Sequence, residues 1–238
     1  SHQSVELCRV AFGFGIPVIS THDAPHAEAV NKLTLPLSDV VVVSKAIPRD
    51  ALLNYGVREI RSFEGVDEVA WTKNFEPTAE FDYDRPLIVV RQMETKAAYA
   101  EGEIDVTENL AKELTTLGNV VFLTRYERKS RSGLIVPRGF IDSVSLAAQA
   151  DLVVGVGGTL AREAALMGTP SIVIPTFGRS YVNEYLSTMG FPLYIVDVEK
   201  VLEYAQKLIG RKYDVKSLLE KLENPVDLIE NVLEEFEN

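Results

Sequence analysis

The hydrophobic positions of the chain fall into short apolar runs separated by amphipathic stretches. Continuous runs rich in Val and Ile, such as residues 39–44 and 152–156, are typical of parallel strands buried on both faces. We predict strands at 16–20, 39–44, 58–61, 87–90, 119–124, 152–156, 171–175 and 192–196. We predict helices at 5–12, 27–35, 48–55, 106–117, 143–150, 159–167, 181–189, 199–209 and 215–236.

The regular alternation of strands and helices predicts an α/β fold with parallel sheets covered on both faces. Residues 62–85 lack periodicity, so we interpret them as an interdomain linker. The predicted domains are a partial Rossmann-like domain at 1–61, a second Rossmann-like domain at 86–210 and an acidic helical segment at 211–238. The chain begins with Ser1 and runs directly into an amphipathic stretch, so we expect a truncated N-terminal domain with a further half-domain preceding it.

Composition narrows the class of protein. A net charge of −11 over 238 residues argues against nonspecific binding to a nucleic-acid backbone. The single cysteine, Cys8, excludes a disulfide framework, and we expect it in an apolar core. The three histidines show no zinc-finger spacing, and neither a membrane-spanning run nor a signal peptide is visible. We therefore expect a cytoplasmic protein.

A glycine-rich junction lies between the apolar run at 152–156 and the next predicted helix. Gly155, Gly157 and Gly158 allow the backbone to turn tightly and to approach a ligand without an intervening Cβ. The first N–H groups of the following helix are unpaired and favour an anion, and ligands of open α/β sheets bind at this edge. Thr159 can cap the helix or donate its hydroxyl to a phosphate.

The junction does not match the common nucleotide motifs. Leu160 stands where the third glycine of a dinucleotide fingerprint is required, and no Gly-Lys-Ser/Thr loop is present. Glu163 lies six residues after Gly157, roughly 7–9 Å along a helix, which is about the distance from the phosphates to the ribose of a nucleotide. We therefore count Arg162 and Glu163 among the candidate nucleotide-binding residues. The alternative is a glycine-rich turn after which both side chains are merely solvated.

A family resemblance rests on these residues. The pattern Gly-Gly-Thr-x-x-x-Glu-Ala-x-x-x-Gly-x-Pro from Gly157 to Pro170 resembles the C-terminal half of GT-B-type glycosyltransferases and of UDP-N-acetylglucosamine 2-epimerase. In those families the equivalent glycines contact the diphosphate and the Glu contacts the uridine ribose. The resemblance implies two Rossmann-like units facing a cleft, and a UDP-sugar substrate without a further cofactor. The whole chain is similar to an uncharacterised, largely archaeal family of predicted glycosyltransferases.

Charged residues after the strand at 87–90 fit an anionic ligand. Arg91, Glu94 and Lys96 would lie at its carboxyl edge, where a diphosphate needs charge neutralisation. The epimerase has a His-Arg-x-Glu-Asn type segment at this place, and Arg91 stands where its His would be, while Glu94 matches its Glu. That departure argues against simple epimerase chemistry. The bland alternative is that these are surface charges beside a long loop.

Other parts of the second domain add candidates for the nucleotide. Arg125 opens a basic stretch at 125–133 and would contact phosphate, unless the stretch is simply a charged loop. By position in the resemblance, backbone groups of Phe140 and Ile141 would pair with the uracil edge. Asn183 is similar in place to an Asn of the glycosyltransferase pattern.

The first domain carries candidate acid/base groups in Asp23, His26 and Glu28. The segment that starts at Glu28 is similar to the Glu-Ala-Asn-Arg-x-Leu-Thr segment of the epimerase, whose Glu is catalytic, but Ala24 stands where the epimerase has a second acid. The alternatives are that these residues belong to the start of a helix, or that Asp23 binds a metal with two histidines. We predict no metal.

The resulting hypothesis is a glycosyltransferase that takes a UDP-sugar donor and an unidentified acceptor, with a homodimer as a possible assembly. Two alternatives stay open: a 2-epimerase-like isomerase, and a noncatalytic nucleotide-sugar-binding or scaffold protein. Trp71, in the predicted linker, is expected to pin the two domains together, with sugar stacking as its alternative role.

Overall fold

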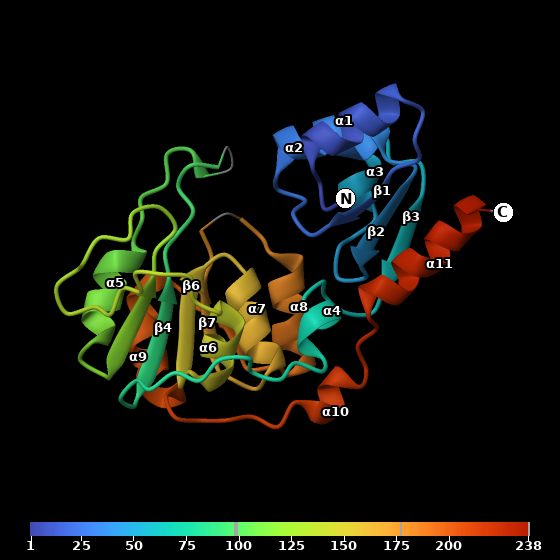
Figure 1. Ribbon diagram of the computed structural model, residues 1–238. Helices are drawn as coiled ribbons and strands as arrows, with labels where there is room; N and C mark the ends of the chain where they lie inside the picture. The colour runs from blue at the N-terminus through green and yellow to red at the C-terminus, as the bar shows by residue number, and fades with distance from the viewer. Residues whose placement is uncertain (98–99, 177, 238) are drawn as a thin grey trace. The chain divides into compact units, whose positions relative to one another are not determined.

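A computed structural model describes residues 1–97, 100–176 and 178–237 of the chain (Figure 1). The chain divides into two compact units, which are described separately. Unit 1 comprises Ser1–Ala70 together with Glu220–Asn238, and unit 2 comprises Trp71–Leu219. The short helix α4 (Val69–Thr72) spans the point at which the chain passes from one unit to the other.

Unit 1 contains a parallel sheet with the strand order β1-β2-β3. The strands are β1 (Ile19–His22), β2 (Val40–Ser44) and β3 (Ile60–Phe63). Its helices are α1 (Val5–Gly13), α2 (Glu28–Thr34), the 3-10 turn η1 (Leu35–Leu37), α3 (Asp50–Leu53) and α11 (Pro225–Glu237). Helix α11, from the end of the chain, packs on β2 and β3 through Val232, which meets Val42 and Phe63 in one buried cluster.

Unit 2 contains a five-stranded parallel sheet with the order β5-β4-β6-β7-β8. Its strands are β4 (Leu87–Arg91), β5 (Asn119–Leu123), β6 (Leu152–Val156), β7 (Ser171–Ile174) and β8 (Leu193–Ile195). Its helices are α5 (Thr107–Leu114), α6 (Ser143–Gln149), α7 (Thr159–Leu166), α8 (Tyr181–Met189), the 3-10 turn η3 (Val198–Lys200), α9 (Val201–Leu208) and α10 (Lys216–Leu219).

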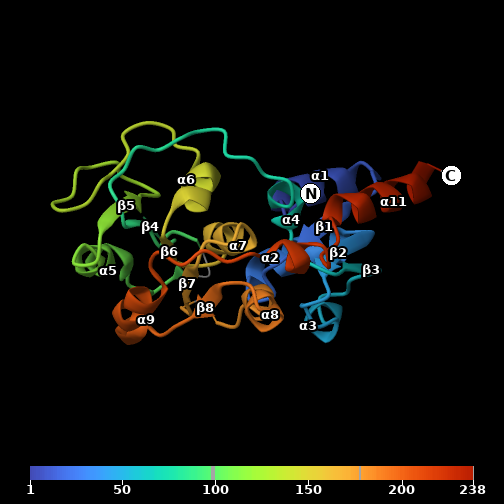
Figure 2. The same ribbon diagram turned by 90° about the horizontal axis from the view of Figure 1, so that it is seen from below.

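Two apolar cores lie on opposite faces of the unit 2 sheet. Helices α5 and α9 pack on one face, over side chains such as Ile88 and Val90 of β4. Helices α6 and α7 pack on the other face, over Leu87 and Val89 of the same strand (Figures 1 and 2). The strands therefore read as continuous apolar runs in the sequence because both of their faces are covered.

The predicted α/β class with parallel sheets is confirmed, and most predicted elements are found within a few residues of their expected ends. The first strand starts at Ile19 rather than residue 16 because Pro17 has no N–H to donate, and pairing with the Asp39 carboxylate begins at the Val18 N–H. The third strand covers 60–63 rather than 58–61.

The C-terminal region differs from the single helix predicted at 215–236. It forms α10 and α11, and α11 begins at Pro225, where a proline is tolerated because its missing N–H has no helical partner. The predicted linker at 62–85 likewise contains the end of β3 and helix α4, and the units divide between Ala70 and Trp71.

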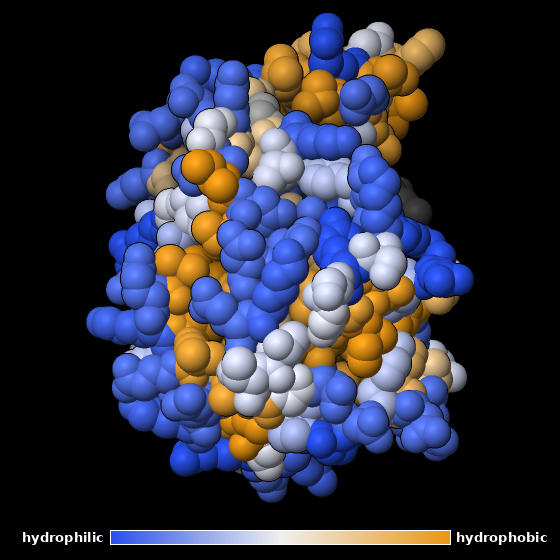
Figure 3. Space-filling view, turned by 90° about the vertical axis from the view of Figure 1, so that its left-hand side faces the viewer, coloured by the Kyte–Doolittle hydropathy of each residue, from blue (hydrophilic) through white to orange (hydrophobic). Residues whose placement is uncertain are grey.

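The surface on the side that lies at the left of Figure 1 is mainly hydrophilic, with separate apolar areas between the polar ones (Figure 3). Helix α1 of unit 1 exposes several apolar side chains, among them Val10 and Phe12. Over the residues that the structure describes, no helix combines the length and the apolar character that crossing a bilayer requires.

Candidate functional site

The glycine junction lies at the point where the strand order of unit 2 reverses direction. β4 is followed along the chain by β5 on one side and by β6 on the other, so the carboxyl ends of β4 and β6 flank a topological switch point. Arg91 ends β4 and pairs in register with Gly155 of β6. Ligands of open α/β sheets bind at such switch points, so this edge is the candidate binding site of unit 2.

Helix α7 starts immediately after the glycines. Gly158 is its N-cap residue and Thr159 its first helical residue, and within the described chain no side chain caps its amides. Thr159 is exposed, although the sequence suggested it as the cap. Because the first N–H groups of α7 have no side-chain cap, the partial positive charge of this helix end is available to an anion.

The two glycines of the turn have different environments. Gly157 has φ +97° and is exposed, and a Cβ added there would meet no atom within 4 Å. A Cβ added at Gly158 would lie 1.8 Å from Nη1 of Arg162. Gly157 therefore leaves room for a ligand, whereas Gly158 leaves room for a side chain of the protein itself, which the sequence did not predict.

A buried guanidinium lies beneath the turn. Arg162 is 5% exposed and its Nη1 donates a 3.1 Å hydrogen bond to Oδ1 of Asn183, which is 2% exposed on α8. Both residues were predicted to bind the nucleotide, and the structure brings them together under Gly158. The charge of Arg162 adds to the positive end of α7.

Glu163, the predicted ribose contact, is buried, so the alternative of a solvated carboxylate after the turn is wrong. It is 6% exposed, and its Oε1 accepts a 2.9 Å hydrogen bond from Nε1 of Trp71. Because the carboxylate is so little exposed, a ligand hydroxyl that approaches this oxygen meets the indole N–H already bonded there.

Arg91 is half-buried close to Glu163. Its burial and the neighbouring Arg125 lower the pKa of Arg91, while Glu163 and Glu94 act in the opposite direction. Glu94 accepts a hydrogen bond from the hydroxyl of Tyr126, which is the main reason that its pKa lies below the ordinary value. Two arginines thus lie near the end of β4, and one of them, Arg125, pairs with Glu94 at 3.8 Å.

The remaining predicted contacts of unit 2 have mixed surroundings. Nε of Arg125 donates to the carbonyl of Gln92 at 2.9 Å, and Nζ of Lys96 lies 4.3 Å from the centre of the Tyr126 ring. Phe140 is 93% exposed, whereas Ile141 packs against the core beside α6. Within the basic stretch at 125–133, Arg131 is committed to Glu108.

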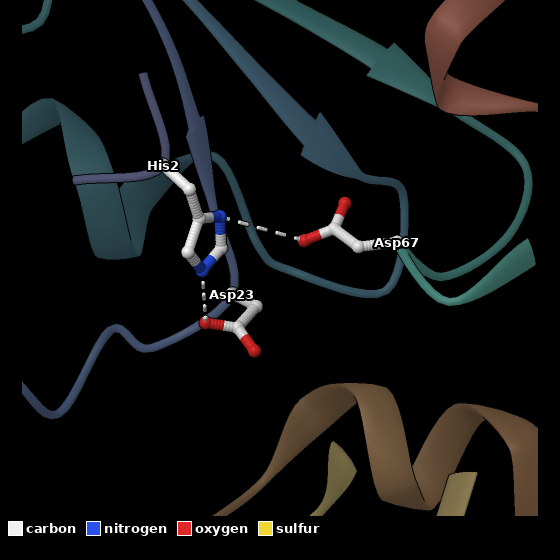
Figure 4. Close-up of side chains that lie close together, drawn as sticks. All are labelled: His2, Asp23 and Asp67. Carbon is white, nitrogen blue, oxygen red and sulfur yellow. Dashed lines mark ion pairs between the residues drawn. The ribbon is translucent and has the colours of Figure 1, made fainter. Parts of the chain in front are cut away.

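In unit 1, three side chains meet at the carboxyl edge of the sheet (Figure 4). His2 lies between two carboxylates: Nε2 is 3.6 Å from Oδ1 of Asp23, and Nδ1 is 3.9 Å from Oδ2 of Asp67. Nδ1 also lies 2.7 Å from Oγ1 of Thr21. The interaction with Asp23 raises the pKa of His2 despite its partial burial, so the geometry suits an imidazolium bridging two acids.

The other predicted acid/base residues divide between two places. Burial lowers the pKa of His26 while Asp23 opposes that shift, so these two residues influence each other. Glu28 instead pairs with Lys32 on the exposed side of α2. Asp23 and His26 therefore belong to one group, and Glu28 is committed to a different partner.

Among the described residues, His2, Asp23 and Asp67 form a group that could hold a metal ion. Their potential ligand atoms lie within 4.8 Å of one another. The two His2 nitrogens face different carboxylates, so a cation would require one carboxylate to rotate to the nitrogen used by the other. The set considered from the sequence, His22 with Asp23 and His26, is not the one that the fold assembles, because His22 is fully buried in β1.

Sequence reasoning did not identify His2, Asp67 or the role of Trp71. His2 and Asp67 are 65 positions apart, and only the parallel order of the strands brings them together. Of these three residues, only Trp71 could have been singled out from the sequence, because it is a lone tryptophan in a stretch without periodicity.

Comparisons with known proteins agree with this architecture. A family model described as "Protein of unknown function (DUF354)" matches residues 1–237. A protein of Methanocaldococcus jannaschii, itself described as uncharacterized, is 33% identical over 243 residues, covering 95% of this chain and 70% of the relative.

Solved structures show the same fold at low identity. UDP-GlcNAc 2-epimerase from Methanocaldococcus jannaschii matches with a TM-score of 0.54 and 14% identity, over 93% of this chain and 69% of the other. The glycosyltransferase SnogD from Streptomyces nogalater matches with a TM-score of 0.52 and 14% identity, over 96% and 75%. The fold is therefore GT-B-like, and the chain belongs to the family described as protein of unknown function (DUF354).

Proposed function

We propose that unit 2 binds the diphosphate of a UDP-sugar and that the protein transfers the glycosyl group to an acceptor. The observation that carries the proposal is the uncapped start of α7, with Gly157 open to solvent, at the switch point beside Arg91. A pyrophosphate there would accept hydrogen bonds from the first amides of the helix. Thr159 would add its exposed hydroxyl.

The charges around the turn suit a departing diphosphate. In the transfer, an acceptor oxygen bonds to the anomeric carbon while the bond from that carbon to the diphosphate oxygen breaks, and UDP leaves with the electron pair. Arg91 and the buried Arg162 stabilise the negative charge that grows on the leaving group. Arg125 and Lys96 lie close to the same strand end and add to the positive field.

The nucleoside end of the donor would extend along α7. Glu163 would bind the ribose diol, two turns from the glycines, in exchange for the Trp71 N–H. Backbone groups of Phe140 and Ile141 would meet the uracil edge, as the family resemblance implies. Asn183 acts through Arg162, since its amide oxygen holds that guanidinium.

Unit 1 would supply the proton acceptor. Burial lowers the pKa of His26, so its imidazole is neutral near pH 7 and can take the proton of an acceptor hydroxyl. Asp23, which His26 senses electrostatically, stabilises the resulting imidazolium. Glu28, which pairs with Lys32 on the exposed side of α2, is not required for this step.

Calorimetric titration tests the donor site. We expect UDP and UDP-sugars to bind and NAD not to bind. Glu163→Gln removes a charged acceptor of ribose hydrogen bonds, so UDP affinity should fall roughly ten- to a hundredfold. Arg91→Met should weaken UDP but leave the weaker binding of uridine unchanged, because it touches only the diphosphate.

Glu113→Gln is the matched control, since it removes one negative charge from an exposed position on α5. Circular dichroism should show native folding for every variant. Absence of UDP binding, preference for NAD, or an unchanged affinity in both Glu163→Gln and Arg91→Met would refute the proposal.

A 2-epimerase remains the second candidate because His2, Asp23 and Asp67 place an imidazole between two carboxylates, and epimerisation by elimination and readdition of UDP requires several acid/base groups. Arg91 and Ala24, which replace a His and an acid of the epimerase pattern, argue against it. Incubation with UDP-N-acetylglucosamine and analysis by NMR separates the candidates: a 2-epimer indicates the isomerase, glycosylated product the transferase, and binding without turnover a carrier or scaffold.

A further inference from the structure

Trp71, the one tryptophan of the sequence, donates a hydrogen bond to the carboxylate that the proposed ribose contact needs. Nε1 of Trp71 lies 2.9 Å from Oε1 of Glu163, and both residues belong to unit 2. An indole N–H is a donor only, and a bond to an ionised carboxylate is stronger than one between neutral groups. Glu163 is only 6% exposed, so a ribose diol that reaches its carboxylate meets the Trp71 N–H there, and the two donors compete for Oε1.

The surroundings of Trp71 permit it to leave without unfolding the protein. Its side chain is 45% exposed, whereas its neighbours in α4, Val69 and Thr72, are 1% and 3% exposed. The buried neighbours hold the backbone of α4 in place. The indole can then move by rotation about its own side-chain bonds, because nearly half of its surface already faces water.

We propose that Trp71 is a gate on the nucleotide site: it donates to Glu163 when the site is empty and releases this carboxylate to the ribose when a nucleotide binds. The inference rests on the proposed donor site and adds its regulation. Because the gated fraction does not bind, the apparent affinity for UDP is lower than the affinity of the open site.

The gate also links the ligand to the chain crossing between the units. Trp71 is the first residue of unit 2 and lies within α4, where the chain leaves unit 1. Release of its indole changes the contacts of this segment, so nucleotide binding alters the segment that joins the two units.

Fluorescence reports the gate directly because the emission of the chain comes from a single indole. On titration with UDP we expect a red shift of the emission and stronger quenching by acrylamide, with the same midpoint as the calorimetric binding curve. Trp71→Phe retains an aromatic ring without the N–H, so it should bind UDP roughly tenfold more tightly by calorimetry. Tyr204→Phe, which removes a polar tip from an aromatic side chain on α9, is the matched control and should bind as the unaltered chain does.

A double-mutant cycle locates the effect. In the Glu163→Gln background, Trp71→Phe should no longer tighten binding, because the charged acceptor for which the indole competes has been removed. UDP binding with unchanged emission and unchanged affinity in Trp71→Phe would overturn the gate while leaving the donor site intact. Failure of both the unaltered chain and Trp71→Phe to bind UDP would overturn both, whereas binding by Trp71→Phe alone would support the gate.

Discussion

Adjacent residues of the same type serve different purposes in the turn before α7. Gly157 has a positive φ and open space around it, so its lack of a side chain leaves room for a ligand that approaches from solvent. Gly158 is packed against the Arg162 guanidinium. A Cβ added at Gly158 would also lie 2.8 Å from Oδ1 of Asn183. The second glycine therefore belongs to a buried Gly158–Arg162–Asn183 arrangement that supports the turn from beneath.

The two glycines should therefore differ in whether the stability cost of replacing them adds to the cost of replacing Asn183. Gly158→Ala pushes the guanidinium away from Asn183 and loses a buried charged hydrogen bond, at a cost of roughly 2 kcal/mol in the free energy of unfolding. Asn183→Ala loses the same bond, so the double variant should cost clearly less than the sum of the two. Gly157→Ala, whose cost comes from a positive φ, should add fully to Asn183→Ala. Urea unfolding of the three single and two double variants checks this, and additive costs for Gly158→Ala and Asn183→Ala would contradict the arrangement.

The buried histidine of β1 predicts a pH dependence of stability. Burial lowers the pKa of His22 to about 4, whereas its ordinary value is 6.5. The unfolded chain therefore binds a proton that the folded chain refuses, and stability falls as the pH drops below about 6.5. Between pH 7.5 and 5 the loss is roughly 2 kcal/mol, measurable by urea unfolding.

His2 provides an internal control of opposite sign. Its pKa is raised in the folded state, so its contribution is present when it is protonated, below its unfolded pKa, and is lost as the pH rises through its folded pKa. His22→Gln should flatten the loss of stability at acid pH, and His2→Gln should steepen it. Equal slopes in the two variants would be inconsistent with this assignment.

At the scale of elements, the pattern of apolar runs predicted the secondary structure well because most strands are buried on both faces. β2, with five consecutive buried residues, needs no alternation to be recognised. The pattern could not assign a partner to α11. An amphipathic helix shows which of its faces is apolar, but not which sheet that face covers, and α11 lies in unit 1 although unit 2 precedes it in the chain.

Two neighbouring residues of α11 test its role. Val232 is 1% exposed against β2 and β3, so Val232→Ala should lower the stability of unit 1 by roughly 2 kcal/mol through lost burial and a cavity. Leu233 is 50% exposed, and Leu233→Ala should change stability by no more than about 0.5 kcal/mol. Urea unfolding of both variants gives the comparison, and similar costs would mean that α11 does not complete the core of unit 1.

At the scale of the whole molecule, the sequence predicted the glycine turn and the basic strand end because both are local patterns. Their convergence follows from the register of Arg91 with Gly155, which a parallel sheet imposes. What escaped prediction are contacts between distant segments: the His2 bridge, and the pairing of Trp71 with Glu163 across 92 positions. A motif can predict that a carboxylate binds a ligand, but no local pattern predicts which distant side chain will donate a hydrogen bond to it.

The division into two units predicts that a nucleotide stabilises only part of the molecule. The buried clusters of unit 2 share no residue with the cluster of unit 1, and the two sheets share no strand. With UDP at a hundred times its dissociation constant, binding adds about 2.7 kcal/mol to the state that binds it, or roughly a hundredfold slower amide exchange. Hydrogen exchange followed by mass spectrometry should show this slowing in β4, β6 and α7, and unchanged exchange in β1–β3 and α11. Equal slowing in both units would mean that the nucleotide is held by unit 1 as much as by the turn at Gly157, and the donor site would then have to be redrawn.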